Sequence, residues 1–285
     1  MDIGLGLPIS NPRALLDWAR RAETSGFDSL ALLDRLTFDN PEPLTALAML
    51  AGATERIRLQ TEVLLGPLRS TALLAKQAAT LDRMSDGRFV LGLGIGGRVD
   101  DHAAAGTPIS QRGRQLDRQL EDLHQIWAGH PYAAPGSVDA GGTIGPAPAT
   151  PGGPPVLIGA FAPPALARVA RHGTGFLCAA PLAWAGPLVT SVREQWDAAG
   201  RAGRPRLVCQ INVAIGPATT TEFARSAIAD YYAFTGKPGW GAPISDPAEI
   251  KDTVAAYQEF GADELVLYCY SPDLAQIEML SDLVF

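Results

Sequence analysis

Short apolar runs alternate with longer amphipathic segments along most of this chain. The apolar runs are rich in Val, Ile, Leu, Phe and Gly, which is typical of strands buried on both faces. We predict strands at 3–8, 29–33, 57–65, 89–94, 156–159, 175–179, 206–215 and 264–268. Apolar residues recur every three or four positions in the segments between them, which indicates helices. We predict these helices at 12–24, 43–54, 70–84, 114–127, 164–171, 184–199, 221–235, 246–260 and 272–283.

Strands that alternate with helices pair in parallel, and short links between them imply right-handed crossovers. Eight evenly spaced strand–helix units in 285 residues favour a (β/α)8 TIM barrel. A doubly wound sheet is the alternative. We expect one domain over 1–285 with inserted segments at about 98–112, 129–155 and 216–246, and a loop of small residues over 100–110.

The stretch 80–97 combines a turn, a buried strand and a glycine-rich exit. Asp86 and Gly87 supply turn chemistry, and the strand 89–94 follows. Gly94, Gly96 and Gly97 permit close approach of the backbone, and Arg98 comes next. Ligands of α/β proteins bind where strands end, so this loop is either an anion site, plausibly for phosphate, or an ordinary glycine-rich turn.

Composition excludes several classes of protein. Hydrophobic residues make up 47% of the chain and charged residues 19%, which suits a large core. The formal net charge is −7 and the basic residues are scattered, which argues against nucleic-acid binding. No apolar run reaches the roughly 18 residues of a membrane helix, and no signal peptide is evident, so we expect a cytoplasmic protein. Cys178, Cys209 and Cys269 lie in apolar runs and are expected to be buried thiols.

Polar residues near the predicted strand ends are the candidates for chemistry. Glu62 lies in an apolar strand, where a carboxylate is costly to bury unless it is paired or protonated. It is either a proton donor or the partner of an arginine such as Arg35 or Arg69. Asp34 and Arg35 follow the second strand, where they either pair with each other at the surface or contact a ligand.

The histidines do not form a metal site. None of the four has another His, a Cys or an acidic cluster at a metal-ligand spacing, so we expect no metal. His102 directly follows the glycine loop and is the one histidine that we regard as a site candidate. The chain has no Gly-x-Ser-x-Gly elbow, which argues against a serine hydrolase.

Several motifs together resemble the bacterial luciferase-like superfamily. They are Glu-Pro-Leu at 42–44, Thr-Glu-Arg-Ile-Arg-Leu at 54–59, Ala-Lys-Gln-Ala-Ala-Thr-Leu-Asp at 75–82, Ser-Asp-Gly-Arg-Phe at 85–89 and Gly-Leu-Gly-Ile-Gly at 92–96. The chain is similar to the actinobacterial branch, whose members use flavin mononucleotide (FMN) or the 8-hydroxy-5-deazaflavin coenzyme F-420.

The resemblance implies a (β/α)8 barrel that binds the reduced coenzyme at its strand ends. It places the phosphate near Gly94, Gly96, Gly97, Arg98, Gly159, Ala160 and Phe161. It places the ring near Pro8, Asp34, Glu62 and Val63, with Glu62, Asp34 and Arg35 as the catalytic candidates. It also implies a cis peptide bond, which fits best between Glu62 and Val63.

The chain departs from the family pattern at several positions, and two of these departures bear on the site. Arg35 stands where the family often has a histidine acid or base, and arginine cannot shuttle protons near neutral pH. Ala160 and Phe161 follow Gly159 where the family usually has a serine, which leaves fewer hydrogen bonds for a phosphate.

The resemblance implies an oxidoreductase acting on an unidentified small organic substrate. With reduced F-420 the reaction is hydride transfer. With reduced FMN it is a two-component monooxygenase reaction, for which a separate reductase supplies the flavin. The substrate contacts are expected from 130–155 and 240–245, and a homodimer is expected. The alternatives are a flavin-binding homologue or supporting subunit without catalysis, and a flavin-free barrel acting on a sugar phosphate.

Overall fold

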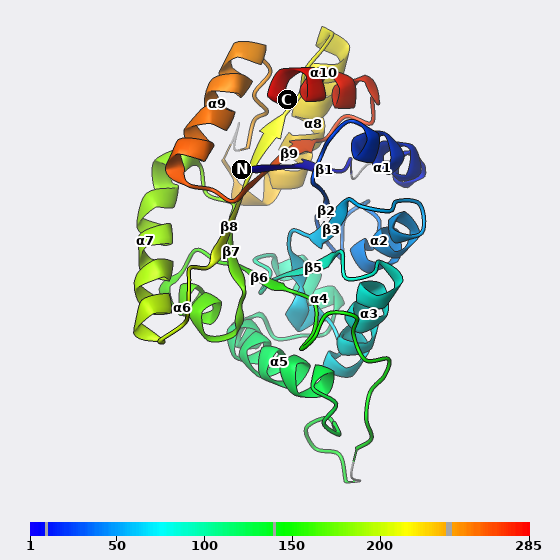
Figure 1. Cartoon of the computed structure of the whole chain (residues 1–285), viewed down its shortest axis with the longest axis vertical. Helices are drawn as coiled ribbons and strands as arrows, with labels where there is room; N and C mark the ends of the chain where they lie inside the picture. Colours follow the sequence, from blue (N-terminus) through cyan, green and yellow to red (C-terminus); the bar gives the residue numbers. More distant parts are fainter. Residues whose placement is uncertain (9–10, 139–140, 238–240) are drawn as a thin grey trace.

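The computed structural model describes residues 1–8, 11–138, 141–237 and 241–285 as a parallel β-barrel enclosed by helices (Figure 1). The strands are β1 (Asp2–Gly6), β2 (Ser29–Leu32), β3 (Arg58–Thr61), β4 (Leu64–Leu65), β5 (Phe89–Gly94), β6 (Val156–Gly159), β7 (Gly175–Cys178), β8 (Arg206–Val213) and β9 (Glu264–Cys269). The expected strands are therefore confirmed, and their ends differ from the prediction by a few residues.

The sheet closes on itself. The strand order is β3-β2-β1-β9-β8-β7-β6-β5-β4, and the pairing of β3 with β5 joins its two ends. β3 and β4 both pair with β5 and form one interrupted barrel strand, so the nine short strands make an eight-stranded barrel. The TIM barrel is confirmed and the doubly wound alternative is wrong, because an open sheet would leave β3 and β4 at opposite edges.

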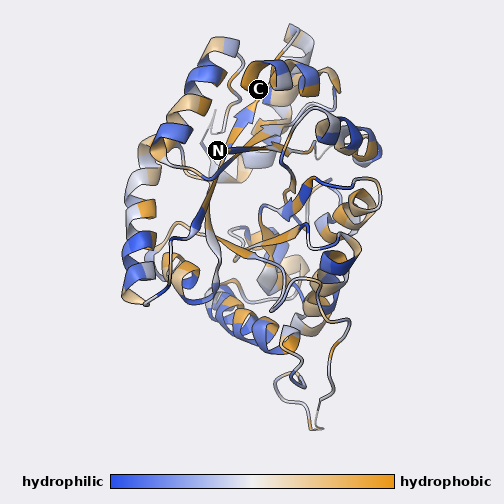
Figure 2. Ribbon diagram, viewed as in Figure 1, coloured by the Kyte–Doolittle hydropathy of each residue, from blue (hydrophilic) through white to orange (hydrophobic). Residues whose placement is uncertain are grey.

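Helices cover the outside of the barrel. They are α1 (Leu15–Thr24), α2 (Pro43–Ala51), α3 (Thr71–Met84), α4 (Val99–Ala104), α5 (Arg112–Trp127), α6 (Pro163–His172), α7 (Leu182–Ala198), α8 (Ala218–Tyr232), α9 (Pro247–Phe260) and α10 (Ala275–Val284). Their apolar faces turn toward the strands and their polar faces turn outward (Figure 2). No helix in the described ranges is long and apolar enough to cross a bilayer.

The expected loop at 100–110 is wrong in its first half. This segment begins with α4, and residues 109–111 form a short 3-10 helix. Small and acidic residues gave no apolar periodicity there, because α4 is fixed by polar contacts of Asp101 rather than by an apolar face.

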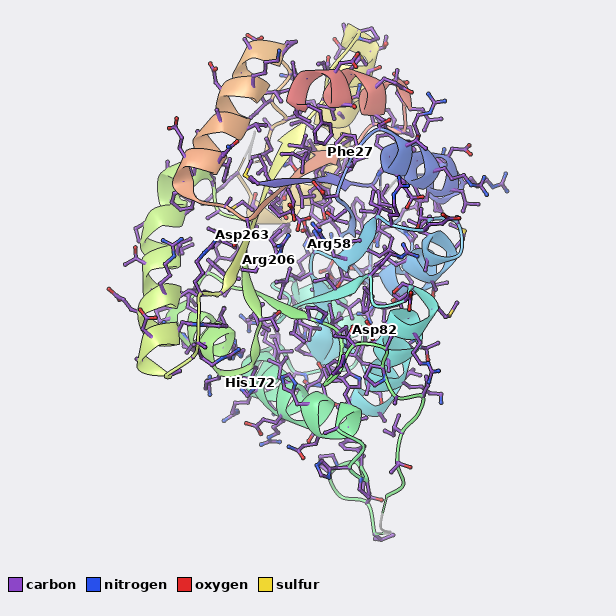
Figure 3. The ribbon with its side chains drawn as sticks, viewed as in Figure 1. Phe27, Arg58, Asp82, His172, Arg206 and Asp263 are labelled. Atoms are coloured by element: carbon purple, nitrogen blue, oxygen red, sulfur yellow. The ribbon has the colours of Figure 1, made fainter. Side chains whose placement is uncertain are left out.

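Charged residues close the floor of the barrel, where the strands begin. Arg58 and Arg206 each donate to Asp2 Oδ2 at 2.7 Å, and both also donate to Glu264 Oε2, at 3.3 and 2.8 Å. Figure 3 labels both arginines. Glu264 is fully buried, so this cation pair is what permits a charge at that depth. Above it lies an apolar layer that includes Ala31, Leu157, Leu177, Val208 and Val266.

Three glycines make room for the break between β3 and β4. The peptide bond between Glu62 and Val63 is cis, as expected. Val63 packs on Gly94 and Gly159, where an added Cβ atom would lie 2.5 and 2.8 Å from its methyl groups. An added Cβ on Gly92 would lie 1.9 Å from the Thr61 carbonyl oxygen. The glycines that look like a ligand loop in the sequence are thus partly packing residues.

This packing predicts that Gly92→Ala destabilises the barrel, because the backbone of β3 has to move. We expect the free energy of unfolding to fall by an amount toward the upper end of about 1–3 kcal/mol, measured by chemical denaturation. Gly97→Ala is the matched control, since no atom lies within 4 Å of its added Cβ. A Gly92→Ala protein as stable as Gly97→Ala would contradict the packing role.

Candidate functional site

A cavity of about 460 Å³ opens at the carboxyl ends of the strands. All but one of the predicted site residues line it, namely Asp34, Arg35, Glu62, Val63, Gly94, Gly96, Gly97, Arg98, Gly159, Ala160 and Phe161. Pro8 is the exception: it is buried behind β1 and does not line the cavity. Further residues that line it are Leu33, Leu65, Ile95, Asp101, Arg112, Ala162, Ala165, Leu177, Ala179, Gln210, Tyr231, Tyr232 and Phe234.

Glu62 is the buried acid of the cavity. Its Oε1 accepts a hydrogen bond of 2.7 Å from Gln60 Nε2, and its Oε2 has no hydrogen-bond partner among the described residues. The Tyr268 hydroxyl lies beside the same carboxyl. Burial, and then repulsion from Glu264, raise the pKa of Glu62 well above its ordinary value. The protonated form of this carboxyl is therefore favoured.

The expected pairing of Glu62 with an arginine is wrong. Arg69 donates to Asp34 Oδ2 at 2.6 Å and to Glu42 Oε1 at 3.0 Å, while Arg35 turns toward α4. Both arginines form their ion pairs with other carboxylates. Glu62 is left without a cation in the part of the chain that the structure describes.

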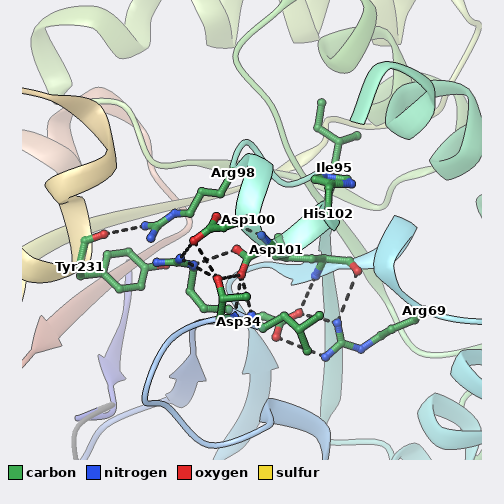
Figure 4. A network of polar contacts seen from close by, with 12 residues as sticks. Asp34, Arg69, Ile95, Arg98, Asp100, Asp101, His102 and Tyr231 are labelled. Carbon is green, nitrogen blue, oxygen red and sulfur yellow. Dashed lines mark hydrogen bonds and ion pairs between the residues drawn. The ribbon is translucent and has the colours of Figure 1, made fainter. Parts of the chain in front are cut away.

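Asp34 is a buried ion-pair partner and not a surface residue. Besides Arg69, its Oδ2 accepts the Leu65 N–H at 2.8 Å, which ties the end of β2 to β4 (Figure 4). Burial outweighs the attraction of Arg69 and raises the pKa of Asp34. The alternative in which Asp34 pairs with Arg35 at the surface is wrong, because the two side chains have different partners.

Asp101 on α4 anchors the loop after β2. Its Oδ2 accepts from Arg35 Nε at 2.8 Å, and its Oδ1 accepts from the N–H groups of Leu36 and Thr37 at 3.0 and 2.8 Å. Burial opposes ionisation most strongly, but the Thr37 donors and the Arg35 guanidinium together hold the pKa of Asp101 below its ordinary value. Arg35 is thus a structural cation at the cavity rim, since Asp100 pairs with it as well.

Arg98 crosses the cavity mouth to the aromatic residues of the segment 216–246. Its Nη2 donates to the Tyr231 carbonyl at 2.7 Å, and its guanidinium carbon lies 3.8 Å from the Phe234 ring centre and 4.6 Å from that of Tyr231. The sequence predicts a phosphate contact for Arg98, and the structure adds a stacking role that joins the segment after β5 to the segment after β8.

Arg112 is a second cation at the cavity that sequence reasoning missed. Its Nη1 donates to the Ile109 carbonyl at 2.6 Å, and its buried Nε has no hydrogen-bond partner within the described chain. No carboxylate is within ion-pair distance of Arg112 in that same part of the chain. Its position at the boundary of the predicted insertion 98–112 was the only sequence signal.

His102 is a structural residue rather than a site residue. It is buried, with Nδ1 3.0 Å from Thr107 Oγ1 and Nε2 3.1 Å from the Ile95 carbonyl oxygen. A carbonyl oxygen can only accept, so Nε2 carries a proton in this contact. Both ring nitrogens are therefore engaged inside the protein. Among the described residues no group of three His, Cys, Asp or Glu side chains is arranged to hold a metal ion.

A smaller cavity of about 380 Å³ adjoins the first and shares Ala179, Gln210 and Tyr232 with it. Gly241 and Ile244 of the predicted substrate segment 240–245 line it, whereas Trp240 lies outside the described residues. Parts of the other predicted substrate segment, such as Tyr132, line a separate hollow beside α5.

The start of α6 is a poor anion site. Pro163 and Pro164 occupy its first two positions and have no N–H groups, and the Ala165 N–H is bonded to the Ala162 carbonyl. Helix starts bind phosphate through free N–H groups, so this one has little to offer. Arg98 and Arg112 are the cations that line the cavity without a carboxylate partner among the described residues.

Comparisons with known proteins agree on the family. A family model described as luciferase-like monooxygenase matches residues 2–243. An F-420-dependent glucose-6-phosphate dehydrogenase of Nakamurella multipartita is 29% identical over 254 residues, which cover 84% of this chain and 74% of that protein.

Solved structures share the whole barrel. The monooxygenase RslO1 from Streptomyces bottropensis superposes with a TM-score of 0.85 at 19% identity, over 99% of this chain and 98% of that one. An F-420-dependent secondary alcohol dehydrogenase, solved with an F-420–acetone adduct, superposes with a TM-score of 0.83 at 17% identity and the same coverage. At these identities the likeness extends to the fold alone.

The contacts of Asp101 predict that it contributes much more to the stability of the fold than its neighbour Asp100 does. Asp101 has 1% of its side chain exposed and Asp100 has 57%, although both pair with Arg35. We expect Asp101→Ala to lower the free energy of unfolding by about 3–5 kcal/mol and Asp100→Ala by less than about 1 kcal/mol. Equal losses in chemical denaturation would refute the anchoring role.

The same contacts give a pH dependence. Because the pKa of Asp101 is lowered from 3.8, its ionised form stabilises the fold fully above that pH. This contribution is lost as the pH falls through the lowered pKa of the folded protein. The stability gap between wild type and Asp101→Ala should therefore narrow only in strong acid, as measured by denaturation across a pH series.

Proposed function

The chain belongs to the luciferase-like monooxygenase family, and from that premise we propose that it is an oxidoreductase that uses reduced coenzyme F-420 on a small organic substrate. Glu62 is the observation that carries this proposal. Reduction of a polar double bond needs a proton as well as a hydride, and a buried carboxyl kept protonated at the cavity can supply it. The name of the Nakamurella relative supports F-420 as the coenzyme.

The described cavity suits a deazaflavin. Its walls are apolar near Leu33, Ile95 and Leu177, which suits a ring, and its cations suit a phosphate. We assign the phosphate contacts to Arg98 and Arg112, with the backbone of Gly96 and Gly97 leaving space for close approach. When bound, reduced F-420 would supply the hydride.

A residue of the chain itself would supply the proton to the substrate. As a C–H bond forms on the substrate carbon, Glu62 gives its proton to the attached heteroatom and becomes a carboxylate. Solvent then returns a proton to Glu62, whose burial again favours the neutral form. Arg35 takes no part as an acid, because it stays charged and is held by Asp101.

A two-component monooxygenase that uses reduced FMN is the second candidate. The fold of RslO1 shows that the same barrel serves a monooxygenase. In that case we expect a separate reductase to deliver the flavin. In either case we expect a homodimer in the cytoplasm. A flavin-binding homologue or supporting subunit without catalysis would bind the coenzyme but turn over no substrate.

A fluorescence titration of the purified protein with F-420 and with FMN, each oxidised and reduced, tests the proposal. Tight binding of F-420 alone is the expected result. Preference for reduced FMN would favour the monooxygenase, and binding of neither would revive the flavin-free sugar-phosphate barrel.

Arg98→Ala should weaken coenzyme binding by about 1.5–3 kcal/mol, because it removes a charge-assisted contact. The measurement is the dissociation constant in the same titration, with thermal unfolding as a check on the lost stacking. Arg114→Ala is the control, since Arg114 is an arginine outside this cavity. Unchanged affinity in Arg98→Ala would remove Arg98 from the phosphate site.

Glu62→Gln should leave the dissociation constant of the coenzyme nearly unchanged and lower kcat by about 10²–10⁴-fold, because an amide cannot donate the proton as an acid does. Single-turnover kinetics with the substrate measures this. Full activity of Glu62→Gln would make Glu62 a structural residue.

A further inference from the structure

A continuous line of polar side chains runs through the barrel from its floor to Glu62. Glu264 Oε2 accepts from Arg58 and Arg206 at the floor. Glu264 Oε1 accepts from the Ser29 hydroxyl and from Gln60 Nε2, the latter at 3.2 Å. Gln60 Nε2 also donates to Glu62 Oε1 at 2.7 Å. The Gln60 amide thus bridges two buried carboxyls.

The two carboxyls have opposite surroundings. Glu264 has two guanidinium groups and a hydroxyl as donors, which favour its charged form. Glu62 receives one amide hydrogen bond and has no cation partner in the described part of the chain. A pair of groups whose environments differ in this way tends to divide into one ion and one acid.

The charge on Glu264 fixes the orientation of the bridge. An ionised carboxylate only accepts hydrogen bonds, so the Gln60 amide must turn its NH2 group toward Glu264. In that orientation the same nitrogen faces Glu62, and Gln60 Oε1 is left without a hydrogen-bond partner among the described residues. Glu62 Oε1 is then an acceptor, and the proton of this carboxyl belongs on Oε2.

We infer that Glu264 is the positioning residue of the site: its charge favours the protonated form of Glu62, and through Gln60 it places the proton on Oε2. The inference rests on the proposed role of Glu62 as proton donor, but the ionisation of Glu62 itself does not require a coenzyme. Glu264 lies at the opposite end of the barrel from the cavity and contacts no substrate.

Other ionisable groups near Glu62 must be considered in its titration. Tyr268 from β9 lies beside the carboxyl, and the Cys209 thiol from β8 is close enough for its own pKa to be raised by Glu62, among other groups. The remaining charged residues around the cavity are Asp34, Arg35, Arg98, Asp101 and Arg112. They are identical in the variants below, so their influence cancels in the comparison.

The test is a pH titration of the coenzyme-free protein labelled with ¹³Cδ-glutamate, followed by NMR, with the Glu62 signal assigned by its loss in Glu62→Gln. In wild type the Glu62 signal should stay that of a protonated carboxyl at pH 7. In Glu264→Gln the repulsion is gone, so the Glu62 midpoint should fall. Glu278→Gln is the matched control, because Glu278 pairs with Arg21 on the surface, and it should leave the midpoint unchanged.

Gln60→Met supplies a second, independent outcome. It removes the amide donor that favours the charged form of Glu62 while the charge of Glu264 remains, so the midpoint should rise. General loosening of the barrel would shift the Glu62 midpoint in the same direction in both variants. A positioning role of Glu264 requires the midpoint to fall in Glu264→Gln and to rise in Gln60→Met. An unchanged Glu62 midpoint in a folded Glu264→Gln, or a fall in Gln60→Met, overturns it.

The enzyme itself gives a further readout. The alkaline limb of the kcat profile should move in the same direction as the Glu62 midpoint in each variant. Failure of the protein to bind F-420 would contradict the proposed function, but it would not affect the conclusion about Glu264 that the NMR titration gives. Correct NMR shifts without any movement of the kcat profile would mean that Glu62 is not the proton donor.

Discussion

A charge can remain inside this barrel only where a counter-charge reaches it, and this constraint shapes the structure from floor to mouth. At the floor, Arg58 and Arg206 compensate Glu264 and Asp2. At the mouth, Arg69 compensates Asp34. Glu62 lies between these two ion-pair groups and has no cation within the described chain. Burial without a cation therefore favours the protonated form of Glu62, which is the form that the proposed proton donor requires.

Packing holds Glu62 where this chemistry is useful. The break between β3 and β4 places Glu62 and Val63 at the cavity, and the absence of side chains on Gly94 and Gly159 leaves room for Val63. Asp101 fastens α4 to the loop after β2 and engages Arg35. A family position that often carries a histidine acid is thus occupied here by a structural cation. The acid chemistry that we propose falls to Glu62.

Segments that follow β5 and β8 meet at the cavity. Arg98, from the first of them, stacks on Phe234 and Tyr231, from the last. The Tyr231 ring meets the rings of Tyr232 and Tyr270 edge to face, and Tyr231 and Tyr232 line the cavity. The cavity mouth is consequently a joint product of segments that are far apart in the chain, which is why it could not be recognised from any single motif.

The sequence by itself determined the strand–helix alternation and favoured the barrel, because eight evenly spaced units suit it better than a doubly wound sheet. The pairing of β3 with β5 then decided between the two. The sequence also located most of the cavity residues, because strand ends in such a barrel meet at one face. Only the tertiary structure decided which charged side chains of the site form ion pairs with one another. Arg69 pairs with Asp34, Arg35 pairs with Asp101, and Glu62 forms a hydrogen bond with Gln60 instead of an ion pair. Ion pairing depends on distances of a few ångströms between distant segments, and no periodicity or spacing in the chain encodes those distances.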